Sequence, residues 1–208
     1  MTFFSNIVKY SCIGAAAIIL SACNQTTVTE DINSSYSSPN STLVVCSGYG
    51  CILKDKFQFT TADEELVHSI MTAGNSTPKG ERAALRKAIA EMENIARRHL
   101  LYKPDIAFSY QKNLGKRGQM DCVDESLNTT NYLKYLQAKG LLRHHKTHRF
   151  YAERGLIIDG RYPHKSARMR DSTGTDWAVD SWKGQDGAAP EIMLLSKWYR
   201  DRNSASNY

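Results

Sequence analysis

Cys122 is the residue with the clearest chemical potential, because it lies at the predicted start of a helix, just after Gly118. The helix is indicated by acidic and hydroxyl residues in its first turn, by apolar residues at helical spacing, and by Gly140 as the residue that ends it. A thiol at a helix N-terminus faces backbone N–H groups without partners and the positive end of the helix dipole. Both favour the thiolate, so the sequence predicts a nucleophile at Cys122.

A base for this nucleophile is predicted in a later segment. Residues 160–182 read as two strands of alternating polarity joined by a turn near Ser172 or Thr173. That turn brings His164 opposite or diagonal to Asp180, within the reach of cross-strand neighbours. An imidazole oriented by a carboxylate is the partner that a cysteine nucleophile needs.

The order of these motifs resembles the transglutaminase-like branch of the papain-like cysteine enzymes, which includes bacterial transglutaminase-like cysteine peptidases. The likeness covers about residues 110–182 and rests on Asp121-Cys122, His164 and Val179-Asp180-Ser181-Trp182. The resemblance implies that Cys122 is the acyl-accepting nucleophile, that His164 is its general base and acid, and that Asp180 orients the histidine.

Such a reaction needs donors for the oxyanion that forms on the attacked carbonyl. The backbone N–H of Cys122 is one expected donor, and the candidates for a second are Gln119, Gln111 and Tyr110. The mechanism requires no cofactor, and no metal site is predicted among these residues.

The carboxylates around the Cys122 thiol disfavour the thiolate. Asp121, Asp124 and Glu125 lie within three residues of Cys122 and raise the pKa of its thiol. A protonated His164 must therefore supply most of the stabilisation of the thiolate. Each residue of the triad also has a structural reading: Cys122 as a small buried side chain, His164 as a surface strand residue, and Asp180 as a turn-side carboxylate.

Residues 1–22 read as an export signal. They carry one charged residue, Lys9, and an apolar run from Cys12 to Leu20 that is too short to span a bilayer. The run ends in Leu20-Ser21-Ala22-Cys23, which looks like the lipobox of bacterial lipoproteins, with Cys23 as the lipidated residue. The alternative is an ordinary signal peptide cleaved nearby. Asn24 is not an aspartate, so the expected location is the periplasmic face of the outer membrane.

Residues 23–41 are rich in Ser, Thr and Asn and predict a disordered tether. The net charge of the chain is +6, and no single element concentrates it. We therefore expect no nucleic-acid partner. The expected partners are the membrane, through the lipid at Cys23, and a peptide or protein substrate in the cell envelope.

Residues 42–59 read as a short hairpin whose turn contains glycines between Cys46 and Cys51. In an oxidising compartment a disulfide between these two cysteines is expected to stabilise the loop by about 2 kcal/mol. Two metal ligands are the alternative, but no second ligand pair lies nearby. If Cys23 is lipidated and the hairpin is bridged, Cys122 is the thiol left over.

Residues 60–203 are long enough for one domain, followed by a frayed tail at 204–208. Thr77 and Pro78 predict the start of a long helix with an apolar stripe. Three histidines at 144, 145 and 148 suggest either a zinc site or a solvated basic strand, and extended geometry favours the strand. Pro190 is expected to open a last helix. Helices followed by antiparallel strands predict an α+β fold with the Cys122 helix packed on a sheet.

From these features three function classes remain. The first is an envelope-anchored cysteine enzyme that attacks an amide, as a peptidase, an amidohydrolase or a transamidase. The second is a catalytically inactive binding module of the same fold, and the third is a structural lipoprotein. The sequence does not distinguish water from an amine as the acceptor.

Overall fold

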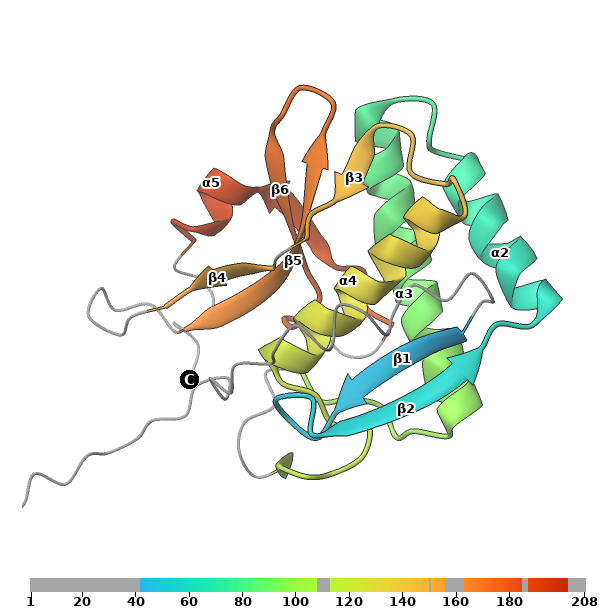
Figure 1. Cartoon of the computed structure of the whole chain (residues 1–208), viewed down its shortest axis with the longest axis vertical. Helices are drawn as coiled ribbons and strands as arrows, with labels where there is room; N and C mark the ends of the chain where they lie inside the picture. Colours follow the sequence, from blue (N-terminus) through green and yellow to red (C-terminus); the bar gives the residue numbers. More distant parts are fainter. Residues whose placement is uncertain (1–41, 108–112, 150, 156–162, 185–186, 202–208) are drawn as a thin grey trace, which may run out of the picture.

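The computed structural model describes residues 42–107, 113–149, 151–155, 163–184 and 187–201. These residues form a mixed α+β structure in which helices and antiparallel strands pack around a main core (Figure 1). A hairpin comes first, helices follow, and an antiparallel sheet with a short final helix completes the described chain. The predicted α+β class is confirmed.

The hairpin consists of β1 (Thr42–Ser47) and β2 (Leu53–Gln58), which pair antiparallel. A disulfide joins Cys46 to Cys51 across the intervening turn. Tyr49 and Cys51 have positive φ angles there, as do the neighbouring glycines, because the turn is tight. The hairpin packs on α3 and α4, so it is part of the same core as the residues that follow it.

Between residues 42 and 107, two helices precede the Cys122 segment. Helix α2 (Thr61–Thr72) begins with a capping box between Thr60 and Asp63. Helix α3 (Pro78–Leu100) begins as the sequence predicts, with Thr77 accepting a hydrogen bond from the N–H of Gly80. Its predicted apolar stripe is buried in the core, apart from the partly exposed Leu100: Leu85, Ala88, Ile89, Met92, Ile95 and Ala96.

Helix α4 (Cys122–Ala138) begins at the predicted nucleophile. It ends in a Schellman motif, in which the N–H of Gly140 bonds to the carbonyl of Gln137 and the N–H of Leu141 to that of Leu136. Gly140 has φ of +70°, a conformation that costs glycine least. The prediction that Gly140 ends this helix is confirmed.

The sheet follows α4 and is antiparallel. The order is β3 (His145–Thr147), β5 (His164–Asp171), β6 (Asp176–Asp180) and β7 (Glu191–Leu194), with β4 (Ala152–Arg154) also paired to β5. Helix α4 packs on β5 and β6 and contacts β1 as well (Figure 1). This helix is therefore enclosed, and its polar residues are buried along with its apolar ones.

The prediction of a helix that begins at Pro190 is corrected. Pro190 does not open a helix: Glu191–Leu194 forms the edge strand β7, because it pairs with β6, and only Leu195–Trp198 forms the short helix α5. Pairing with a sheet edge outweighed the apolar spacing of this segment. The strand-like residues 156–158 and the tail 204–208 lie outside the described residues.

The histidine cluster is also not a solvated strand throughout. The ring of His145 is buried, and its Nδ1 lies 2.8 Å from Oε1 of Glu81, at the start of α3. Glu81 accepts the backbone N–H groups of Arg143, His144 and His145 too. Because Arg82 donates to Nε2 of His145 at 3.1 Å, that nitrogen is an acceptor and the ring is neutral. The cluster joins β3 to α3 and has a structural role.

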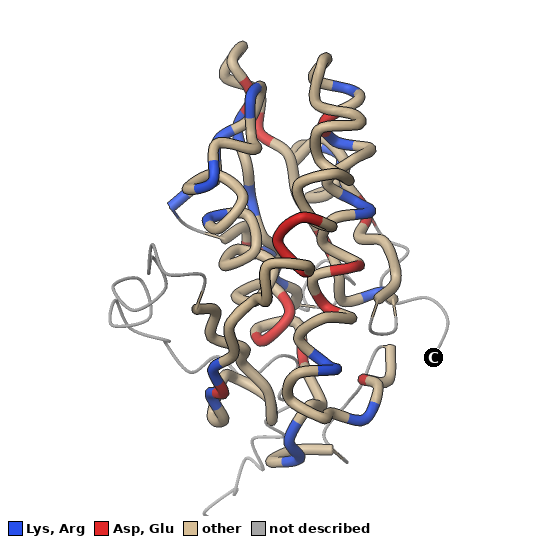
Figure 2. Tube along the Cα trace, turned by 90° about the vertical axis from the view of Figure 1, so that its right-hand side faces the viewer, with Lys and Arg blue, Asp and Glu red and all other residues tan. Residues whose placement is uncertain are grey.

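Lys and Arg residues are spread over several elements, as the charge-coloured tube in Figure 2 shows. The acidic residues include a group near the middle of the molecule. Within the described residues, no helix is both long and apolar enough to cross a membrane.

Candidate active site

Cys122 is the first residue of α4, and its side chain is fully buried. In this structure Cys122 is disulfide-bonded. The prediction that its thiol is left unpaired is therefore wrong for this state of the protein. A sulfur in a disulfide has neither a proton to lose nor a lone charge to attack with, so any nucleophilic role belongs to the reduced protein.

The carboxylates near Cys122 hold the backbone around it. Asp121 caps α4 by accepting the N–H groups of Val123 and Asp124 through Oδ1, both at 3.0 Å. Asp124 completes a capping box by accepting the N–H of Asp121 at 3.1 Å. These bonds fix the backbone on both sides of Cys122.

The same carboxylates dock the disulfide loop on the start of α4. Asp124 accepts the N–H of Tyr49 at 2.8 Å and that of Cys51 at 2.7 Å, and Asp121 accepts the N–H of Gly50 at 3.2 Å. One turn further along α4, Asn128 bonds to both the N–H and the carbonyl of Cys46. The loop is therefore a wall of the Cys122 site.

Burial and the neighbouring charge of Asp121 raise the pKa of Asp124 well above its ordinary value, even though three N–H groups bond to its carboxyl. The raised pKa of Asp124 reduces its ionised fraction, and with it the repulsion of a thiolate on Cys122. Asp124 therefore raises the pKa of the Cys122 thiol less than an ionised carboxylate at this position is expected to.

His164 and Asp180 meet as the sequence predicts. In the sheet Ala167 pairs with Val179, a register that places Asp180 diagonally across from His164. The Nε2 atom of His164 lies 2.7 Å from Oδ2 of Asp180, and both side chains are almost completely buried. A carboxylate only accepts hydrogen bonds, so Nε2 carries the proton of this bond. The other ring nitrogen, Nδ1, is buried and has no hydrogen-bond partner among the described residues.

The carboxylate of Asp180 remains ionised in this environment. Burial by itself raises its pKa, but the charge of His164 and hydrogen bonds from His164 and Trp198 outweigh burial and lower the pKa. The Trp198 bond runs from Nε1 to the same oxygen, Oδ2, at 2.8 Å. Asp180 is thus held by two donors.

Trp182 connects the pair to the start of α4. Its ring lies 4.7 Å from the ring of His164, between centroids, and it packs in one buried cluster with Cys122 and the Cys46–Cys51 disulfide. Two turns after Cys122, Thr129 shares a hydrogen bond of 2.8 Å with Ser181. The end of β6 is therefore fixed against α4, and Trp182 links His164 to the buried cluster that contains Cys122.

Of the three residues predicted as oxyanion donors, the structure describes only Gln119. The side-chain amide of Gln119 donates to the carbonyls of Pro104 and Gly118, and its oxygen accepts from Asn113. Its donors are therefore in use within the loop before α4. Gln111 and Tyr110 lie outside the described residues.

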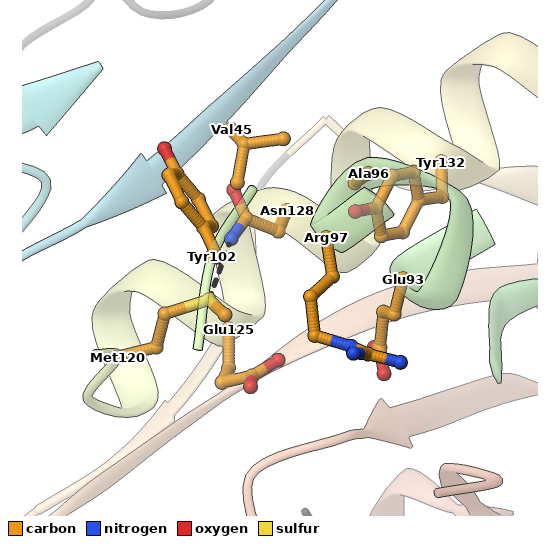
Figure 3. Close-up of a pocket in the computed structure, with 9 residues that line it drawn as sticks. All are labelled: Val45, Glu93, Ala96, Arg97, Tyr102, Met120, Glu125, Asn128 and Tyr132. Carbon is orange, nitrogen blue, oxygen red and sulfur yellow. Dashed lines mark hydrogen bonds between the residues drawn. The ribbon is translucent and has the colours of Figure 1, made fainter. Parts of the chain in front are cut away.

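A pocket lies beside α4, on the side that faces α3 (Figure 3). The pocket is small and partly open to solvent, with room for about one water molecule. The lining residues are Val45, Glu93, Ala96, Arg97, Tyr102, Met120, Glu125, Asn128 and Tyr132. Met120 and Glu125 flank Cys122 in the sequence, so the pocket borders the start of the nucleophile helix.

Cys46, Cys51 and Asp124 also place ligand atoms within 4.8 Å of one another. Metal binding requires thiolates, and these two sulfurs are joined in a disulfide. In this state the group does not bind a metal through sulfur.

Sequence reasoning missed Trp198, Arg154 and Asn128. Trp198 follows Pro190 in a segment of apolar residues, and its indole N–H gives no periodic signal in the sequence. Arg154 lies directly opposite His164 in the β4–β5 pair, which is a contact between strands that only the fold defines.

Comparisons with family models, curated proteins and solved structures find no match for this chain.

Proposed function

We propose that this protein is a cysteine enzyme of the transglutaminase-like type, which attacks an amide bond through Cys122, His164 and Asp180. The observation that carries the proposal is the buried bond of 2.7 Å between Nε2 of His164 and Oδ2 of Asp180. Trp182 packs on His164 and lies in the same buried cluster as Cys122, the first residue of α4. The resemblance of the sequence motifs to that family agrees with the order of the three residues.

The free Nδ1 atom of His164 supports the same role. In its neutral form, a His164 ring that donates Nε2–H to Asp180 presents the Nδ1 lone pair, which is the acceptor that a thiol proton needs. A buried nitrogen without a partner costs free energy unless it has a use. Proton transfer from the reduced Cys122 thiol would give that nitrogen its partner.

The reaction follows from these roles. The thiolate of Cys122 attacks the carbonyl carbon of an amide, and the resulting oxyanion is stabilised by the N–H of Cys122 at the helix N-terminus. The C–N bond breaks, and His164 gives its Nδ1 proton to the leaving amine, leaving a thioester on Cys122. Water or a second amine, deprotonated by His164, then attacks the thioester and releases the thiol.

A catalytically inactive binding module is the second candidate. The observation in its favour is that Cys122 is buried and disulfide-bonded in this structure. If the disulfide is permanent, the same fold binds peptides or wall components without turnover. The two candidates differ in whether a reduced Cys122 becomes acylated.

For location, the proposal is a lipoprotein of the bacterial cell envelope, anchored through Cys23. The support is the sequence Leu20-Ser21-Ala22-Cys23 after a short apolar run. The proposed substrates are peptides or proteins of the envelope.

The test is direct detection of the thioester. Reduced protein is incubated with a mixture of envelope peptides, quenched in acid and digested. The mass of the peptide that contains Cys122 is then measured by mass spectrometry. We expect an acyl adduct on Cys122 that disappears in Cys122→Ala and after hydroxylamine treatment. Absence of an adduct and of released amine in fully reduced, folded protein would support the binding module instead.

A further inference from the structure

Trp198 is fully buried and comes from α5, well after the predicted triad in the sequence. Its Nε1–H bonds to Oδ2 of Asp180 at 2.8 Å, the same oxygen that bonds to His164. The other carboxylate oxygen, Oδ1, is buried and has no hydrogen-bond partner among the described residues. Trp198 and His164 are therefore the two donors that this carboxylate has within the described chain.

Trp198 also touches the ring that it helps to orient. Its centroid lies 5.6 Å from that of His164, on an aromatic surface shared with Trp182 at 4.7 Å. The imidazole is thus enclosed by two indoles while its Nε2 is directed at Asp180. One residue controls both the position of the carboxylate and one side of the ring.

Arg154 holds Trp198 in this place. Its guanidinium lies 4.7 Å from the centroid of the indole, and Nη1 donates to the carbonyls of Trp198 and Asp201 at 2.8 and 2.7 Å. Arg154 is itself buried and pairs with His164 across β4 and β5. The clamp therefore joins the strand of His164 to the helix of Trp198.

We infer that Trp198 is a positioning residue for the His164–Asp180 pair, held in place by Arg154. This inference rests on the proposed function, because it assigns Trp198 a role in the same reaction. Trp198 does not contact the reacting atoms. It acts by fixing the carboxylate that fixes the imidazole.

The charged groups that face Asp180 set the expected direction of a pH effect. They are His164 on β5, Lys183 in the following loop and Glu191, which pairs with Asp180 from β7. Lys183 in turn bonds to Glu191 and Asp201. Removing the Trp198 N–H leaves these charges in place and takes one donor from the carboxylate, so Asp180 is protonated at a higher pH.

The variant Trp198→Phe keeps an aromatic ring and removes the donor. The matched control is Trp177→Phe, since Trp177 lies on β6 and its Nε1–H also bonds to a carboxylate, that of Asp171, at 2.9 Å. We expect Trp198→Phe to move the acid limb of Cys122 alkylation in reduced protein upward by about one pH unit. Trp177→Phe is expected to leave that limb in place. Equal profiles for the two variants would overturn the inference.

A second measurement does not depend on the reactivity of Cys122. In protein with labelled histidine and tryptophan, NMR should show the Nε2–H of His164 and the Nε1–H of Trp198 as slowly exchanging protons that shift together when Asp180 titrates. This test needs no variant that risks unfolding. If wild-type Cys122 shows no dependence on His164, the proposed function fails, yet the coupled shift still supports the positioning role. Independent shifts of the two protons would refute that role whether or not the enzyme is active.

Discussion

At the scale of single residues, the protonation states of the site follow from its hydrogen bonds. Asp180 is a buried carboxylate with two donors, so Nε2 of His164 carries a proton, while Nδ1 is buried without a hydrogen-bond partner among the described residues. The neutral ring of His145 follows from the same reasoning, with Glu81 on one nitrogen and Arg82 on the other. Nδ1 of His164 has no hydrogen-bond partner among the described residues, whereas both ring nitrogens of His145 are hydrogen-bonded.

Asp180 makes the stability of the fold depend on pH. Its pKa is lowered in the folded protein, so its contribution is present above the pKa of an unfolded aspartate, about 3.9, and is lost as the pH falls through the folded value. Asp180→Asn keeps an oxygen that can accept from His164 and Trp198 but removes the charge. We expect the variant to lose stability less steeply than wild type below about pH 4.

Urea unfolding at a series of pH values measures this difference. Asp63→Asn, on the surface-facing start of α2, controls for the loss of a carboxylate whose pKa is also lowered, away from the site. If wild type and Asp180→Asn have the same pH dependence, Asp180 is not held as a carboxylate by these donors.

Glu81 is a second residue whose loss has a defined cost. It accepts three backbone N–H groups and the ring of His145 in a buried site. Glu81→Ala leaves those N–H groups without an acceptor, so we expect the free energy of unfolding to fall by about 3 kcal/mol or more. Glu91→Ala on the same helix removes a surface pair with Arg98 and is expected to cost under about 1 kcal/mol. Equal effects in denaturant unfolding would argue against the Glu81 network.

At the scale of elements, the start of α4 and the disulfide loop form one unit. Asp124 joins them, because its carboxyl bonds to Tyr49, Cys51 and Asp121. Asp124→Ala leaves three buried N–H groups without an acceptor, and we expect a loss of about 2–4 kcal/mol in the free energy of unfolding. Amide hydrogen exchange at Tyr49 and Cys51 should accelerate in the variant.

The control for this prediction is the equivalent position of another capping box. Asp63 caps α2 as Asp124 caps α4, but it holds no separate loop. Asp63→Ala is expected to cost about 1 kcal/mol and to leave exchange in the disulfide loop unchanged. Similar losses in both variants would show that the docking of the loop contributes little.

The sequence predicted the elements whose signals are local. Thr77 with Pro78, the start of α4 at Cys122 and its end at Gly140 depend on capping chemistry within a few residues. The turn near Ser172 fixed the register of β5 and β6, and with it the meeting of His164 and Asp180. These features needed no knowledge of distant contacts.

The features that were missed depend on contacts between distant segments. Glu191–Leu194 is a strand because it pairs with β6, and Trp198, which follows this strand, bonds to Asp180 at the end of β6. The disulfide of Cys122 also contradicts the count of cysteines that left it unpaired. Apolar spacing gives no indication of which donor will meet which carboxylate.

At the scale of the whole molecule, the proposed lipid anchor tethers a domain whose cations are spread over many elements (Figure 2). Attachment then depends on the acyl chains at Cys23 rather than on charge. We expect the full-length protein to incorporate labelled fatty acid and to fractionate with membranes, and Cys23→Ser to do neither. A wild-type protein that takes up no fatty acid would refute the lipoprotein assignment.

The central claim is that reduced Cys122 is activated by His164, and alkylation tests it most directly. Reduced protein is treated with iodoacetamide across pH, and the rate at Cys122 is followed by peptide mapping, which separates it from Cys46 and Cys51. We expect rapid labelling near neutral pH, where an unperturbed thiol titrates near pH ~8.5, and a slower rate with a higher midpoint in His164→Ala. Labelling of Cys122 as an ordinary thiol, with the same profile in His164→Ala, would contradict the claim.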